Sequence, residues 1–164
     1  LEPIRWYAYP NSVLYVRNAG VEFEPHVEYY GFLNDRRLKE HLAEADIALV
    51  PFNIEDEPEY HYARYSIPSR LTEFMDAGLP IFAAAGRQTD TARFMRERGL
   101  GECGTLARTE DCYRQLEALA RSQGRRRRLG QQARRYAEEH CDVVKYRAQL
   151  RDRLCAQWRQ PAFR

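Results

Sequence analysis

The chain has 164 residues, of which 44% are apolar and 30% are charged, and its formal net charge is +2. This length is enough for one globular domain with a full hydrophobic core. No segment approaches the roughly 18 to 20 consecutive apolar residues of a membrane-spanning helix, and no signal-peptide pattern opens the chain.

The first part of the chain contains two strand-like segments. An aromatic-rich run at residues 4–9 and a second run at residues 27–31, which ends in glycine, both predict strands. Between them, residues 12–17 fit either a short helix or a strand, and the pattern does not decide between the two. The chain starts with Leu1 instead of methionine, which suggests a piece of a longer protein.

A helix and a buried strand are predicted next. Residues 35–45 have the apolar spacing of an amphipathic helix. Residues 47–52 form a continuous apolar run, which is typical of a parallel strand covered on both faces, and Pro51 fits only near the end of such a strand. The long polar stretch at 53–66 predicts a functional or mobile loop.

In the second half of the chain, the sequence pattern predicts further alternation of helices and strands, followed by helices only. Residues 68–77 predict a helix that begins at Pro68 or Ser69 and stops before Gly78 and Pro80. The other segments are a strand, a helix, a weak strand and three helices, which are predicted in this order at 81–85, 89–98, 101–106, 109–122, 124–140 and 143–158.

This order predicts an α/β fold, namely a Rossmann-like, doubly wound parallel sheet with a C-terminal helical tail. We expect the Rossmann-like domain to span residues 1–140. The C-terminal helix is expected to span residues 141–164 and to pack back on this domain or on an acceptor domain that the sequence lacks. Sheets of this kind bind ligands at the carboxyl ends of their strands. The segments expected at those ends are 31–34, 51–66 and 86–90.

The helix that follows the long loop carries an unusual pair of charges. Arg70 and Glu73 are three residues apart and share a face. A cation in the first turn is disfavoured by about 0.3–1 kcal/mol, and arginine before glutamate is the weaker order for a helical ion pair. A bound anion would explain Arg70, because a guanidinium beside backbone N–H groups forms a phosphate site. Glu73 can accept hydrogen bonds from a ribose, so the pair predicts a nucleotide site.

The same stretch resembles a known family. Pro68, Ser69, Arg70 and Glu73, followed by Gly78 and Pro80, are similar to the donor-binding segment of bacterial group-1 glycosyltransferases with the GT-B fold. The resemblance implies that Arg70 meets the diphosphate of a sugar nucleotide and Glu73 meets its ribose. It makes Arg70 the candidate catalytic residue.

A second block of sequence extends the resemblance over roughly residues 25–140. The segments at 27–33 and 44–51 are similar to the family pattern that precedes the donor-binding segment. The family resemblance implies that the nucleotide base lies against the backbone of Gly31, Phe32 and Leu33. The remaining candidate donor contacts are Pro51, Ser66, Ser69, Arg70 and Glu73.

The chain departs from the family pattern in two ways. Tyr65 stands where many members have a second glutamate, so the contacts to the sugar are not defined. The usual opening of the donor domain and the acceptor domain are not found in this sequence, so we expect this piece alone to bind donor weakly and to be inactive.

The resemblance implies a retaining glycosyltransferase that moves a sugar from a UDP- or GDP-sugar to a glycan or lipid-linked acceptor in cell-envelope polysaccharide synthesis. It implies no cofactor and no metal. Two alternatives remain open: a nucleotide-sugar epimerase of the same fold, and a non-catalytic Rossmann-like binding module. The base, sugar, acceptor and linkage are not defined by the sequence.

Charge and cysteine content bear on partners and location. Residues 1–106 carry 11 Lys/Arg against 17 Asp/Glu, a net −6, and residues 107–164 carry 15 against 7, a net +8. The basic tail is either a solvated helix surface or a peripheral contact with the inner face of a membrane, and we expect no nucleic-acid partner.

The four cysteines show no CxxC spacing, which favours free thiols in the cytoplasm.

Overall fold

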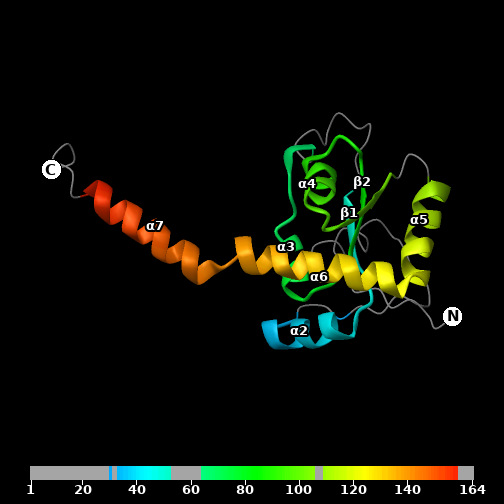
Figure 1. Cartoon of the computed structure of the whole chain (residues 1–164), viewed down its shortest axis with the longest axis horizontal. Helices are drawn as coiled ribbons and strands as arrows, with labels where there is room; N and C mark the ends of the chain where they lie inside the picture. The colour runs from blue at the N-terminus through cyan, green and yellow to red at the C-terminus, as the bar shows by residue number, and fades with distance from the viewer. Residues whose placement is uncertain (1–29, 31–32, 53–63, 106–108, 159–164) are drawn as a thin grey trace. The chain divides into compact units, whose positions relative to one another are not determined.

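A computed structural model of the chain describes residues 30, 33–52, 64–105 and 109–158 (Figure 1). The chain divides into two compact units, Leu1–Ala43 and Glu44–Arg164, which are described separately. The strands expected at 4–9 and 27–31, the undecided segment at 12–17 and most of the loop at 53–66 lie outside the described residues.

Helix α2 (Asp35–Glu44) is the described element of the first unit, and it confirms the helix expected at 35–45. The side chain of Asn34 caps its start, because Oδ1 of Asn34 accepts a hydrogen bond of 3.0 Å from the backbone N–H of Arg37. Leu42 is buried, and the rings of Tyr30 and His41 have centroids 4.3 Å apart.

The second unit contains a three-stranded parallel sheet with strand order β1-β2-β3. The strands are β1 (Ala48–Phe52), β2 (Ile81–Ala85) and β3 (Gly101–Gly104). Every residue of β2 is buried, which explains why its sequence is apolar at each position. The sheet confirms the α/β class and the parallel strands expected from the sequence.

In the described part of the second unit, five helices accompany the sheet, and all five were predicted from the sequence. They are α3 (Leu71–Asp76), α4 (Asp90–Arg98), α5 (Thr109–Arg121), α6 (Gln123–His140) and α7 (Val143–Trp158). Helix α4 packs on β2 and β3, α5 packs on β3, and α6 lies along α3. Figure 1 shows α3 beside the middle of α6.

Alternate residues of the sheet contact different helices. Phe82 and Ala84 belong to one buried cluster with Cys112 and Leu119 of α5. Cys103, which pairs with Ala83 in the sheet register, has its Sγ atom 4.0 Å from the carbonyl oxygen of Ala92 in α4. Because neighbouring residues of a strand point to opposite faces, α4 and α5 contact different faces of the sheet.

A pair of glycines allows α6 to approach the turn after α3. Gly78 ends α3 with a positive φ of 70°, so the helix stop expected at this residue is confirmed. A Cβ atom on Gly130 of α6 would collide with the carbonyl oxygen of Gly78. The lack of a side chain at Gly130 therefore sets how closely α6 can lie against this turn.

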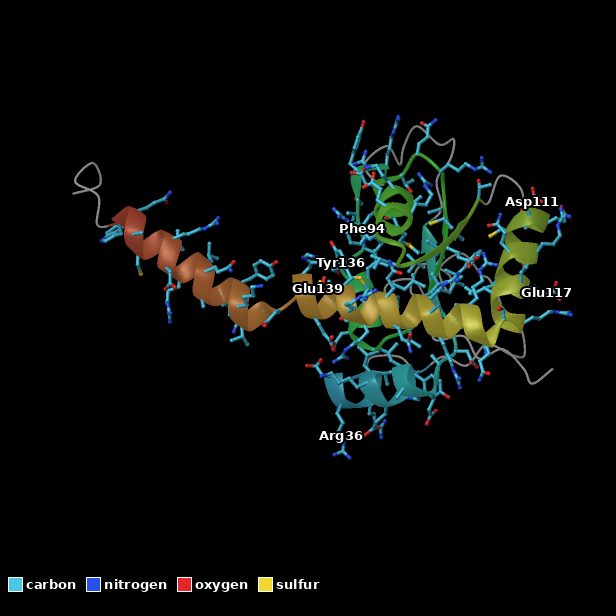
Figure 2. All side chains as sticks on the ribbon, in the orientation of Figure 1. Arg36, Phe94, Asp111, Glu117, Tyr136 and Glu139 are labelled. Carbon is cyan, nitrogen blue, oxygen red and sulfur yellow. The ribbon has the colours of Figure 1, made fainter. Side chains whose placement is uncertain are left out.

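Aromatic contacts join α6 to α4. The ring of Tyr136 meets Phe94 edge to face, with centroids 5.6 Å apart, and it lies 4.5 Å from the ring of His140 (Figure 2). The guanidinium of Arg98 lies 6.0 Å from the Tyr136 ring centroid. Offset and edge-on ring pairs of this kind contribute stabilising free energy in addition to that from the apolar surface that they bury.

No helix within the described ranges has both the length and the apolar content needed to cross a membrane.

Candidate functional site

The turn between β2 and α4 forms one part of the carboxyl edge of the sheet. Gly86 follows β2, and Thr89 occupies the N-cap position of α4 with an extended backbone. The Thr89 hydroxyl accepts a hydrogen bond of 3.2 Å from the N–H of Ala92 and donates one of 2.8 Å to the carbonyl oxygen of Gly86. Thr89 thus bonds to both sides of the turn, and α4 begins directly after it at the carboxyl edge of the sheet.

A hydrogen bond brings the segment before α3 to the same edge. Thr91, in the first turn of α4, is fully buried, and its hydroxyl donates a hydrogen bond of 2.8 Å to the carbonyl oxygen of Ser66. Arg64 reaches the same turn, because its Nη2 atom lies 3.1 Å from Oε1 of Gln88. Residues 64–66 therefore lie at the carboxyl end of β2, which is where open parallel sheets bind ligands.

Arg70 and Glu73 follow this anchored segment. The Nη1 atom of Arg70 lies 3.8 Å from Oε2 of Glu73, and the two side chains are 41% and 46% exposed. An ion pair this long and this exposed contributes little to stability, on the order of 0–1 kcal/mol. Both side chains are thus partly exposed, and a ligand can reach them from solvent.

The start of α3 differs from the expectation. The helix begins at Leu71, and Arg70 occupies the N-cap position in a helical conformation, without a side-chain capping bond. Ser69 contributes its carbonyl oxygen, which accepts from the N–H of Thr72 at 3.2 Å and from the Thr72 hydroxyl at 2.7 Å. The prediction that Pro68 or Ser69 begins the helix is therefore wrong, because backbone bonds of a preceding turn take the place of a cap.

The other candidate donor contacts do not all fall in the described unit. Gly31 and Phe32 lie outside the described residues, and Leu33, which is partly exposed, belongs to the first unit. Pro51 is exposed and lies in β1, opposite Ala84 in the register. Ser66, Ser69, Arg70 and Glu73 thus lie in one continuous segment of the second unit, and together with Pro51 these residues remain candidates by position.

Further arginines at the carboxyl edge were not singled out from the sequence. Arg87 lies in the turn after β2 and is exposed, and its carbonyl oxygen accepts a hydrogen bond of 3.0 Å from Nη2 of Arg96. Arg93 forms an ion pair of 3.0 Å with Asp90. Arg64 and Arg70 belong to the same described part of the edge, where Glu73 and Asp90 offset part of the positive charge. In the sequence these arginines are spread over about 30 positions with no common motif.

Two thiols of the second unit, those of Cys103 and Cys112, are poorly suited to a reactive site. Burial raises the pKa of Cys103 to about 11, against a smaller opposing effect of Arg96 and a further increase from Glu102. Burial also raises the pKa of Cys112. A thiol that keeps its proton is a poor nucleophile and a poor metal ligand. Over the described part of the chain, no group of three or more His, Cys, Asp or Glu side chains is arranged to hold a metal ion.

Comparison of the chain with models of known protein families and with curated proteins finds no match.

Proposed function

We propose that this chain is the donor-binding, Rossmann-like domain of a retaining GT-B glycosyltransferase, with a doubly wound sheet, and that it binds a nucleoside-diphosphate sugar. In this proposal the guanidinium of Arg70 binds the diphosphate and the carboxylate of Glu73 accepts hydrogen bonds from the ribose hydroxyls. Pro51, Ser66 and Ser69 are proposed to line the same site.

The observation that carries the proposal is the exposed Arg70–Glu73 pair, close in sequence to a segment that Thr91 holds at the carboxyl end of β2. An arginine can bind two phosphate oxygens through its planar fork, and a carboxylate is suited to two neighbouring hydroxyl groups. Arg64 and Arg87 add positive charge near the same edge, which favours a ligand with several negative charges.

The proposed chemistry uses Arg70 as an electrostatic catalyst. In sugar transfer the bond between the anomeric carbon and the diphosphate oxygen breaks, and the diphosphate leaves with the electron pair. An acceptor hydroxyl forms the new bond to the anomeric carbon and releases its proton. Negative charge increases on the diphosphate in the transition state, so a guanidinium placed against it lowers the barrier. Glu73 would orient the nucleotide.

Calorimetry with the intact chain tests the two assigned roles separately. We expect UDP or GDP to bind, and we expect Arg70→Ala to weaken binding about tenfold or more, because a charge-assisted hydrogen bond contributes about 1.5–3 kcal/mol. The same substitution should weaken binding of pyrophosphate. Glu73→Ala should weaken binding of the nucleoside diphosphates about fivefold or more but leave pyrophosphate affinity unchanged or improved, since pyrophosphate has no ribose.

A matched pair of charges serves as the control. Arg121 and Glu117 form an exposed helical ion pair on α5. Arg121→Ala and Glu117→Ala should change neither nucleotide nor pyrophosphate affinity by more than about twofold, as expected for exposed charges away from a ligand. If neither nucleotide binds the wild-type chain, or if the Arg70 and Arg121 variants behave alike, the proposal is wrong.

A further inference from the structure

Helix α7 presents an apolar surface that is not covered by the described structure. Val143, Leu150 and Leu154 are 62%, 59% and 57% exposed, Trp158 is 75% exposed, and no residue of α7 is buried. The helix is capped locally, because Oδ1 of Asp142 accepts hydrogen bonds from the backbone N–H groups of Val144 at 2.9 Å and Lys145 at 3.0 Å. Local signals therefore define this helix. Packing against the other described residues does not account for its exposed apolar side chains.

Four of the large apolar side chains of α7 lie on one side of the helix and form what we call the α7 stripe. It consists of Val143, Tyr146, Leu150 and Leu154. At about 100° per residue, these four residues fall within about 80° around the helix axis. Val144, which is 79% exposed, projects about 80° beyond Leu154 and lies outside the stripe. Trp158 continues the stripe near the end of the helix, four residues after Leu154.

Basic residues border the α7 stripe on both sides. On the same helical projection, Arg153 lies about 20° beyond Tyr146. On the other side, Arg147 lies between Leu154 and Trp158, about 20° from each, and Arg151 lies about 20° beyond Trp158. The acidic residue of the helix, Asp152, projects to the side opposite the stripe. With Lys145, the helix carries four basic residues and one acidic residue, a net charge of +3.

Large apolar side chains with basic residues beside them are suited to contact with the surface of an anionic membrane. Apolar side chains enter the boundary between headgroups and acyl chains, and tryptophan and tyrosine favour the same depth. Arginines at the border can extend their charged ends to phosphate while their methylene stems cover apolar surface. Each such cation gains additional attraction from a negatively charged leaflet.

The other arginine-rich part of the tail is already engaged. In α6, Arg125 forms an ion pair with Glu102 of β3, and Nη2 of Arg126 lies 3.3 Å from Oδ1 of Asp46. These side chains attach α6 to the sheet and to the segment before β1. The charge of α6 is thus partly used for packing, whereas Arg147, Arg151 and Arg153 of α7 are exposed, and Arg151 pairs within its own helix with Asp152 at 3.3 Å.

The spacing of the stripe argues against pairing with a second α7. A coiled coil needs apolar residues that alternate in steps of three and four, whereas the spacing from Val143 to Trp158 is three, four, four and four. The helix has 16 residues, about two heptads, which is short for a stable pair. In a parallel pair, Arg147 would also lie near its own copy beside the seam.

We propose that α7 binds the surface of an anionic lipid bilayer through the α7 stripe, with Arg147, Arg151 and Arg153 facing the lipid phosphates. The proposal does not depend on nucleotide binding or on sugar transfer. It assigns one face of one helix to lipid and identifies the residues that border this face.

Vesicle sedimentation with the full chain tests this proposal. We expect the chain to bind vesicles of phosphatidylcholine mixed with phosphatidylglycerol at low salt, to bind pure phosphatidylcholine at least tenfold less, and to dissociate as salt is added. The double variant Leu150→Glu, Leu154→Glu should lower binding to the anionic vesicles at least tenfold. The emission of Trp158 should shift to shorter wavelength on binding, and Trp158→Phe should abolish that shift.

The control variant adds the same charge to the opposite face. Ala148→Glu with Ala156→Glu should lower vesicle binding only about two- to threefold, since both positions project to the side of the helix opposite the α7 stripe. Both double variants should keep the wild-type circular dichroism and melting temperature, because α7 buries no residue.

Three results would overturn the proposal. The first is absence of binding to the anionic vesicles at low salt. The second is an equal loss of binding in the two double variants, which would mean that only net charge matters. The third is a wild-type dimer in sedimentation equilibrium that the Leu150→Glu, Leu154→Glu variant converts to a monomer, which would assign the stripe to a second copy of the chain.

Discussion

The hydroxyl of Thr91 and the carbonyl oxygen of Ser66 are 2.8 Å apart, and this hydrogen bond joins segments that are 25 residues apart in the sequence. Thr91 is fully buried in the first turn of α4, whereas Ser66 lies in the irregular segment that leads to Arg70. Through the buried side chain of Thr91, this bond holds the segment that leads to Arg70 against the sheet. Its strength should therefore affect both stability and ligand binding.

Thr91→Val removes this bond while it keeps the side-chain shape. We expect a loss of about 1–2 kcal/mol in the free energy of unfolding, because a buried hydrogen bond is lost. If the site binds nucleotide as proposed, its affinity should fall as well, since residues 66–70 lose an anchor. Urea unfolding and calorimetry measure the two effects.

The control for that substitution is Thr72→Val. The Thr72 hydroxyl also donates to a backbone carbonyl, that of Ser69, but Thr72 is exposed, so water can replace the lost bond. We expect a change within about 0.5 kcal/mol. Equal losses in the two variants would show that the bond between Thr91 and Ser66 has no special role.

Gly130→Ala should destabilise the chain although alanine favours helix. The new Cβ atom would collide with the carbonyl oxygen of Gly78, and the resulting shift of α6 should cost about 1–3 kcal/mol. Gly124→Ala in the same helix is the control, because nothing lies within 4 Å of the place that its new methyl group would take. This variant should gain up to about 1 kcal/mol from helix propensity. In denaturant unfolding, the free energy of unfolding should fall for Gly130→Ala and rise for Gly124→Ala. A rise in both variants would contradict the close approach of α6 to the turn at Gly78.

Thr89→Ala should loosen the beginning of α4. It removes the hydroxyl that accepts from the N–H of Ala92 and donates to the carbonyl of Gly86, and loss of an N-cap side chain costs about 0.5–2 kcal/mol. Thr89→Ser keeps the hydroxyl and should retain most of the stability. Thermal unfolding of the two variants measures the difference, and similar losses in both would assign the effect to the missing methyl group instead.

The burial of Cys103 predicts a fall in stability at alkaline pH. Its pKa is raised from 9.0 to about 11 in the native chain, chiefly by burial. The unfolded chain therefore binds fewer protons than the native chain between these pH values, and the free energy of unfolding falls as pH rises. The contribution is complete below about pH 9, and by about pH 11 roughly 2–3 kcal/mol is lost.

Denaturant unfolding at several pH values between about 8 and 11 isolates this effect. Cys103→Ala should have a shallower loss of stability with pH than the wild type, whatever its stability at neutral pH. Cys155→Ala, which alters an exposed residue of α7, should keep the wild-type dependence. If Cys103→Ala retains the full dependence, other groups cause it.

Most secondary structure could be predicted from local patterns. The buried run 81–85 and the stop at Gly78 define β2 and the end of α3 through apolar content and a positive φ, both of which are properties of the local chain. The start of α3 was missed by one to three residues. The pattern of proline and serine is the same for a capped helix and for a helical turn that precedes one, and backbone bonds decide between them.

The candidate site was predicted in part. Arg70 and Glu73 were found from their spacing, because residues three apart share a helix face whatever the tertiary structure. Thr91, Arg64 and Arg87 were missed, since their relation to Arg70 depends on which strands pair and on where α4 begins. No signal within the sequence alone links these positions.

The sequence by itself determined the α/β class, the helices and strands of the described unit, and the charge pair at the start of α3, because periodicity, glycine and proline act over a few residues. Only the tertiary structure decided that Thr91 meets Ser66, that Gly130 meets the carbonyl of Gly78, and that the apolar stripe of α7 is exposed. These relations arise from close packing between distant segments, and an amphipathic pattern looks the same whether a core or another surface covers it.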